Sequence, residues 1–252
     1  MQDGPRYLTE SDLNTISLTK DTQYGALGQT ADGRFYRYAS FSGTSTVNPG
    51  LLMVAAAAPA NSTGLAITAV GTGGQLTSNL QAGSTQLVIT NGATAVTQDE
   101  FGFLEIIVSA GGSYKLKLRG NTAAAANTGY ITVYLQEPLP ANTTQLIPGT
   151  DTVNLRVNPY KLVGASLTKA QPIGVTVTSV PLTSANSPYY GWVQTLGPAF
   201  VAATTATKGQ VISQDLAGTA GFVKSYAGTT DNIVGVAQES AASSTTRFLQ
   251  RT

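Results

Sequence analysis

Short segments in which apolar and polar residues alternate recur along this chain, and turn sequences separate them. In Lys115-Leu-Lys-Leu-Arg, the cations face one side of an extended chain and the leucines face the other. Asn48-Pro-Gly, Asn91-Gly and Gly111-Gly are typical turn sequences. Short strands at this spacing are typical of β-sandwiches and β-barrels, so we expect an all-β fold.

We expect two β-sandwich or barrel-like domains behind an extended N-terminal arm. The arm spans residues 1–30, the larger domain 31–165 and the smaller domain 166–252, with the boundary placed after Asn158-Pro-Tyr-Lys. The expected strands share the alternating or apolar pattern and lie at 65–70, 86–90, 103–109, 114–119, 130–135, 153–157, 173–178, 190–195, 209–213, 233–238 and 247–249.

Charge is scarce and unevenly placed. Charged residues make up 11% of the 252-residue chain, against roughly 25% in an ordinary soluble domain. None lies between Ser40 and Gln98. Such a surface can be covered by Thr, Ser and Asn, or it can be buried in an assembly. The formal net charge of +1 gives no electrostatic reason to expect nucleic acid or an anionic membrane as a partner.

The chain contains neither cysteine nor histidine, which excludes disulfides, thiolate nucleophiles, zinc fingers, imidazole bases and Ser-His-Asp triads. The 13 carboxylates are scattered. Asp99-Glu100 and Glu105 form the one cluster, and we interpret it as a solvated turn before a strand rather than a glycosidase pair. We therefore expect no enzyme, no catalytic residue, no metal site and no cofactor.

Two aromatic segments leave alternatives open. Arg34-Phe-Tyr-Arg-Tyr could stack nucleic-acid bases, or it could be a strand with its aromatic rings turned inward. Tyr189, Tyr190 and Trp192, the last being the single tryptophan, could form a sugar-binding platform, or Trp192 and Tyr190 could fill the core of the smaller domain.

Neither a membrane span nor a secretion signal is expected. The chain has no apolar run of the length that crosses a bilayer. The segment from Met1 to Asp12 is polar and lacks a basic region followed by an apolar one.

A set of segments in fixed order resembles the capsid decoration, or cement, proteins of tailed bacteriophages, over residues 24 to 251. The segments are framework patterns of turns and core strands: Leu27-Gly-Gln-Thr-Ala-Asp-Gly-Arg-Phe-Tyr-Arg-Tyr, Lys117-Leu-Arg-Gly-Asn-Thr-Ala-Ala-Ala, Tyr130-Ile-Thr-Val-Tyr-Leu-Gln-Glu-Pro-Leu, Asn158-Pro-Tyr, Pro172-Ile-Gly-Val, Tyr189-Tyr-Gly-Trp-Val-Gln-Thr-Leu-Gly-Pro-Ala, Gly209-Gln-Val and Ile233-Val-Gly-Val-Ala.

The resemblance implies a structural virion protein on the exterior of a phage head, assembled in the host cytoplasm. Its partner would be the major capsid protein of the same phage. Such proteins are usually homotrimers that clamp neighbouring capsid subunits and stabilise the expanded shell, although dimers and monomers also occur. No nucleic acid or membrane is involved. The alternative from another class is a carbohydrate- or receptor-binding module of a tail fibre or surface protein.

Under this hypothesis the arm lies over the capsid lattice. Its expected contacts are the apolar or aromatic Tyr7, Leu8, Tyr24 and Leu27, while Arg34 and Arg37 would pair with capsid carboxylates. The uncharged region from residue 40 to 98 would hold part of the homo-oligomer interface. Deleting residues 1 to 30 is then expected to abolish binding and to leave the fold intact.

Overall fold

The computed structural model describes residues 5–55, 65–66, 83–107, 113–127, 129–140, 151–166, 170–183, 188–227 and 232–251, with the backbone alone at 65–66 and 241–251. One short helix, α1 (Glu10–Asn14), lies among these described residues, and the remaining elements are strands. The all-β prediction is confirmed.

The chain forms two compact units whose limits differ from those predicted. Unit 1 joins residues 1–57 to residues 159–252, and unit 2 comprises residues 58–158. The predicted boundary near residue 165 was wrong because strands far apart in the sequence pair within unit 1. For example, β3 (Phe35–Phe41) pairs along β12 (Tyr189–Ala206).

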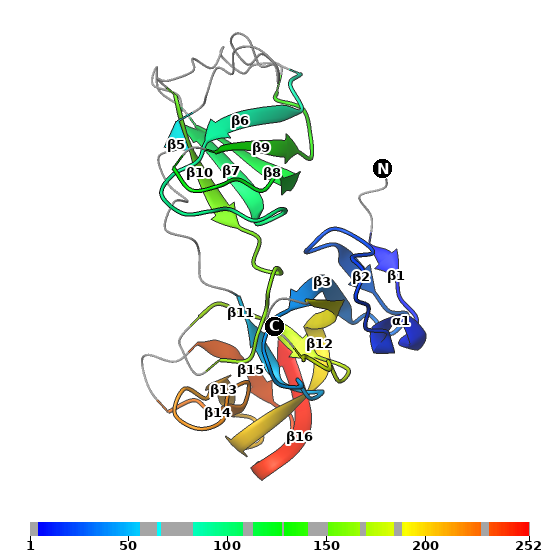
Figure 1. Ribbon diagram of the computed structural model, residues 1–252. Coiled ribbons are helices and arrows are strands. Elements are labelled where there is room, and N and C mark those ends of the chain that lie inside the picture. Colours follow the sequence, from blue (N-terminus) through cyan, green and yellow to red (C-terminus); the bar gives the residue numbers. More distant parts are fainter. Residues whose placement is uncertain are drawn as a thin grey trace. The chain divides into compact units, whose positions relative to one another are not determined.

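Unit 2 is one antiparallel sheet in the order β5-β10-β7-β8-β9-β6 (Figure 1). Its strands are β5 (Leu65–Ala66), β6 (Gln86–Thr90), β7 (Phe101–Ile107), β8 (Ser113–Asn121), β9 (Tyr130–Leu135) and β10 (Thr152–Val157). Alternate residues of these strands point to one side and form a closed apolar core. The core residues include Leu87, Ile89, Phe101, Leu104, Ile106, Leu118, Ile131, Val133, Leu135, Val153 and Leu155.

In unit 1, one part of the sheet follows the order β1-β2-β3-β12, and β11 joins β12 to β4. The added strands are β1 (Arg6–Tyr7), β2 (Leu27–Gln29), β4 (Leu52–Val54) and β11 (Pro172–Thr176). Buried residues of β3, β4, β11 and β12, among them Phe41, Met53, Ile173 and Val193, form its core.

The second part of unit 1 is a ring of five strands made by β12, β14 (Val223–Ser225), β13 (Val211–Gln214), β15 (Ile233–Ala237) and β16 (Ala241–Arg251). The ring closes because β16 pairs antiparallel with β12 as well as with β15. Small side chains such as Ala199, Ala203 and Ala237 share its interior with Ile212 and Val223. These small side chains suit the narrow interior of a small barrel.

Strand β12 serves both parts because it contains a bulge, a register shift between Gln194 and Leu196. The buried Gln194 amide donates hydrogen bonds to the carbonyls of Leu196 (3.4 Å) and Pro198 (2.6 Å). Gly197 has a φ of +92°, a conformation that glycine adopts without strain. The strand therefore changes direction here without leaving the freed carbonyls unpaired.

The N-terminal segment is not an extended arm, in contrast to the prediction. Strand β1 pairs with β2, and Thr9 caps α1 by a capping box with Asp12. Leu8 and Leu13 are 6% and 2% exposed and pack with Tyr36, Tyr38 and Trp192. Two leucines facing inward from a polar sequence, together with the pairing of β1 and β2, attach the segment to unit 1.

Four sequence-based expectations fall partly or wholly outside the described residues. Of the predicted strand at 65–70, the structure describes residues 65–66, where β5 lies, and of that at 103–109 it describes residues 103–107. Much of the uncharged region from 40 to 98, including 56–64 and 67–82, also lies outside them, as does the turn at Gly111-Gly.

Candidate functional site

The six residues predicted to touch a capsid differ widely in exposure. Tyr7 is 77% exposed on β1, whereas Leu8 is buried in the cluster of Leu13, Tyr36, Tyr38 and Trp192. Tyr24, Leu27, Arg34 and Arg37 are half-buried. Tyr7 alone among them is a large apolar side chain presented to solvent, and Leu8 is a core residue.

The two arginines are engaged inside unit 1. Arg34 forms ion pairs with Glu10 (2.7 Å) and Asp32 (2.6 Å), and Arg37 donates a hydrogen bond to the carbonyl of Gly25 (2.7 Å). Hydrogen bonds from Thr30 and Arg34 hold the pKa of Asp32 below its usual value. The charge of Arg34 is therefore largely neutralised within the unit, so it is a weaker candidate for an external salt bridge than the sequence suggested.

The aromatic platform expected as an alternative does not form. Trp192 is 5% exposed, and its ring meets that of Tyr38 edge-on at 5.3 Å between centroids. Tyr190 is half-buried and stacks with Tyr24 (6.3 Å) and Tyr38 (6.4 Å). The alternative in which Trp192 is a core residue is confirmed, but its core partners are Leu8, Leu13, Tyr36 and Tyr38 rather than residues of a separate domain at 166–252. Sugar stacking on Trp192 would require it to leave that core.

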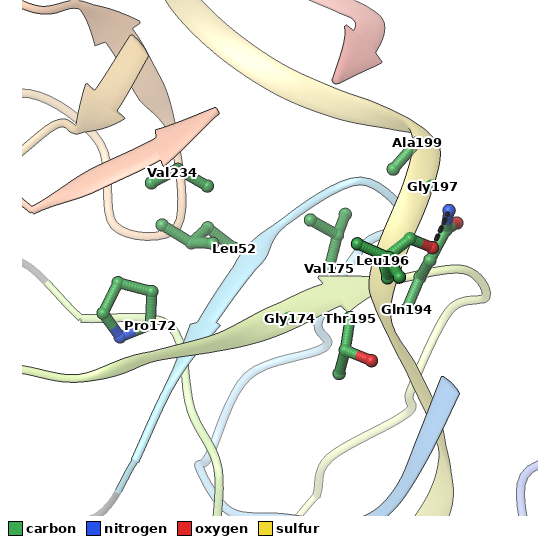
Figure 2. A pocket seen from close by; sticks show the side chains of 10 residues that line it. All are labelled: Leu52, Pro172, Gly174, Val175, Gln194, Thr195, Leu196, Gly197, Ala199 and Val234. Atoms are coloured by element: carbon green, nitrogen blue, oxygen red, sulfur yellow. Dashed lines mark hydrogen bonds between the residues drawn. The ribbon is translucent and has the colours of Figure 1, made fainter. Parts of the chain in front are cut away.

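A small pocket lies beside the bulge of β12 (Figure 2). Its volume is about 20 Å³, little more than one water molecule needs. Figure 2 shows the Gln194 amide turned toward the Leu196 carbonyl, so the polar group there is already bonded within the bulge. The pocket is lined by Leu52, Pro172, Gly174, Val175, Gln194, Thr195, Leu196, Gly197, Ala199 and Val234. It is a packing defect rather than a ligand site.

The carboxylates serve local structure. Glu100 accepts hydrogen bonds from the amide and hydroxyl of Thr97 (2.7 and 2.9 Å), which confirms the turn interpretation. Asp215 accepts from the amides of Ala217 and Gly218 and from the Thr204 hydroxyl. In the described part of the chain, no three acidic side chains gather as a metal site. Over the same residues, no helix has the length and apolarity needed to span a membrane.

Both units expose large apolar side chains, and of these the sequence predicted Tyr7 as a contact residue. Those of unit 1 are at least 37% exposed and are Tyr7, Leu18, Leu196, Phe200, Val211, Tyr226 and Ile233; those of unit 2 are Phe103, Ile107, Tyr130 and Tyr134. Strand alternation could have placed some of them on outer faces, but the identity of the inner face emerges only from the sheet pairing.

Cations gather on one face of unit 2. The sequence placed Lys115, Lys117 and Arg119 on one side of a strand, and the sheet brings Arg156 of β10 to the same face, across from Phe103. A hollow of about 410 Å³ lies there, lined in part by Phe103, Lys117 and Arg156.

Comparisons with known proteins give no relative: no protein-family profile, no curated protein and no solved structure matches the chain.

Proposed function

We propose that this chain is a structural virion protein that binds the outer surface of a phage head and cements neighbouring major capsid subunits. The observation that carries the proposal is the set of large apolar side chains exposed on both units, most of them on strands, in a chain with few charges. Exposed apolar groups of this kind favour protein–protein contact. The phage assignment itself rests on the sequence resemblance.

The chemistry of the described residues supports a binding role. Arg34 forms ion pairs with both Glu10 and Asp32, and Glu100 and Asp215 hold turns. The pocket beside Gln194 is too small for a substrate. A protein that acts by adhesion needs buried area and matching surfaces, and these are what such a scaffold offers.

The stabilising mechanism is mass action. A protein that binds the assembled shell and not its dissociated subunits lowers the free energy of the assembled state. If the protein is a trimer, as the resemblance suggests, its second and third contacts become intramolecular, which raises the avidity without any new kind of contact. The glycan-binding alternative loses its main support because Trp192 is buried.

Co-sedimentation tests the proposal. Purified protein is mixed with expanded, undecorated heads of the phage that encodes it, the heads are pelleted, and the bound protein is quantified. We expect binding that saturates at a fixed ratio to the capsid subunit. Folded protein that stays in the supernatant at all concentrations would contradict the proposal.

Two variants locate the contact. Tyr7→Ala with Leu18→Ala removes the two large exposed apolar side chains of the N-terminal segment, 77% and 66% exposed, and is expected to reduce the bound fraction. Ser11→Ala, at an exposed position of α1 between them in sequence, is the matched control and should bind as the wild type does. Equal binding by both variants would exclude the N-terminal segment as a contact.

A further inference from the structure

The outer face of β10, β7 and β8 combines positive charge with an apolar centre. In the sheet register Phe103 lies opposite Arg156 on one side and Lys117 on the other, and in the next row Glu105 lies between Asn154 and Lys115. Directly opposed side chains in a sheet are close enough to contact one ligand together. Phe103 is 48% exposed, so its ring is available to a partner.

The distribution of charge in unit 2 is uneven. Its four cations all lie on β8 and β10, at exposed positions. Of the five carboxylates of unit 2, Glu105 is the one that lies in β7, β8 or β10. Although residues 58–158 together carry one more carboxylate than cations, this face is positive.

Two of the cations are available for a ligand. The other two cations already have partners. Lys115 Nζ lies 4.0 Å from Glu105 Oε1, and Arg119 Nε donates a hydrogen bond to the carbonyl of Leu135 (3.0 Å). Lys117 and Arg156 form no ion pair with any described residue. Both line the hollow of about 410 Å³ that also includes Phe103, a volume in the range of sites that hold a ligand or several side chains, roughly 300–1,000 Å³.

Glu105 distinguishes between two classes of acidic ligand. Its carboxylate accepts a hydrogen bond from the Asn154 amide (3.2 Å) and is 28% exposed at the middle of the face. A phosphate backbone would place further negative charge beside it without offering a donor, which is unfavourable. A polypeptide backbone offers N–H donors to Glu105, while its acidic side chains reach the cations.

We propose that this face binds an acidic, extended segment of a partner protein. Aspartate or glutamate carboxylates of the segment pair with Lys117 and, in a bidentate ion pair, with Arg156. The methylene groups of these acidic side chains cover the ring of Phe103. The inference rests on the proposed function only for the identity of the partner, a capsid subunit. The acidic chemistry of the ligand comes from the face itself.

The test measures the affinity of the full chain for a hexaglutamate peptide and for an oligothymidylate of equal charge. The test variant carries Lys117→Glu and Arg156→Glu, and the control carries Lys208→Glu, an exposed cation of unit 1. We expect the double variant to lose affinity for hexaglutamate by roughly tenfold or more and the control to stay within about twofold. Rising salt should weaken wild-type binding.

Further variants and readouts keep the outcome decisive. Lys117→Gln with Arg156→Gln removes the two charges without adding repulsion, and we expect it to lose affinity for hexaglutamate as well. This variant tests the role of the charges even if the charge reversal harms the fold. Equal hexaglutamate affinity in all variants, or preference for oligothymidylate, would overturn the inference.

The same double variant in the head co-sedimentation experiment separates the two proposals. Undiminished pelleting of the variant would overturn the role of this face and leave the proposed function standing. A wild type that fails to pellet, yet binds hexaglutamate through Lys117 and Arg156, would overturn the proposed function and support an acidic partner of another kind.

Discussion

Gly28 lies on β2 where the buried side chains of Leu8 and Trp192 converge. A Cβ atom added there would overlap Leu8 Cδ1 and would lie 2.9 Å from a ring carbon of Trp192. We expect Gly28→Ala to destabilise unit 1 by about 1–3 kcal/mol, because a methyl group would have to displace packed side chains. Urea unfolding followed by Trp192 fluorescence measures the effect.

Gly164→Ala is the control for that substitution. Its added Cβ would make ordinary contact, 3.4 Å from the carbonyl oxygen of Ser42. We expect a change below about 1 kcal/mol. Equal losses in both variants would mean that overpacking between Leu8 and Trp192 is not the cause.

Tyr36 makes the stability depend on alkaline pH. Burial raises its pKa from 10.0 to about 12. Up to about pH 10 the Tyr36 hydroxyl is protonated in both the folded and the unfolded chain, so its full contribution to the free energy of unfolding is present. Between pH 10 and 12 it ionises first in the unfolded chain, so the free energy of unfolding falls, by about 2–3 kcal/mol in all.

Urea unfolding at a series of pH values tests this, with Tyr36→Phe as the comparison. The variant keeps the packed ring but cannot ionise there, so its stability should fall less steeply above pH 10. Burial also raises the pKa of Tyr38. Ionisation of Tyr38 therefore accounts for part of the fall in stability that remains in the Tyr36→Phe variant above pH 10. Identical pH profiles for wild type and variant would contradict the assignment.

Individual site residues were harder to predict than individual strands. Nothing in the sequence distinguishes exposed Tyr7 from buried Leu8, because the inner side of a two-residue strand is set by what packs on it. Glu10 and Arg34 are far apart in the chain, so the sequence spacing could not predict their ion pair. The turn role of Glu100 could be predicted from the sequence, because its hydrogen-bond partner Thr97 lies three residues away.

At the scale of elements, the N-terminal segment is part of the fold. Leu13 is 2% exposed on α1, so Leu13→Ala should lower the free energy of unfolding by about 2–4 kcal/mol. Tyr7→Ala, at a position 77% exposed, should change it by less than about 0.5 kcal/mol. Thermal and urea unfolding of the two variants measure the difference.

Because Leu8 and Leu13 pack against Trp192, a deletion of residues 1–30 is no longer expected to leave the fold intact. Removing residues 1–30 takes away Leu8 and Leu13 and uncovers Trp192, so we expect the fold itself to weaken rather than binding alone. A truncated chain with wild-type stability and blue-shifted tryptophan emission would show that this segment contributes little.

Strands with their own hydrophobic pattern were predicted well, and those that depend on neighbours were not. β6 and β9 have the predicted limits, 86–90 and 130–135. β1, β2, β4 and β14 have two or three residues each, too few for a period to be visible. The second half of β12 contains Gly197 and Pro198, which usually end a strand, and here the Gln194 amide bonds the carbonyls freed by the bulge.

At the scale of the molecule, the order of pairing sets the division into units. Unit 2 lies within the sequence of unit 1, between residues 57 and 159. A reading along the chain places β3 and β4 with the strands that follow them, yet β3 pairs with β12 and β4 with β11. Such long-range partners leave no local signal, whereas the all-β class follows from local alternation alone.

We propose that the protein stabilises an assembled shell through its exposed apolar side chains and the cationic face of unit 2. The most direct measurement is the disruption temperature of phage heads by scanning calorimetry, with and without saturating protein. We predict a higher disruption temperature for the decorated heads and a smaller increase with the Lys117→Glu, Arg156→Glu variant at equal concentration. An unchanged disruption temperature at full occupancy would contradict the claim.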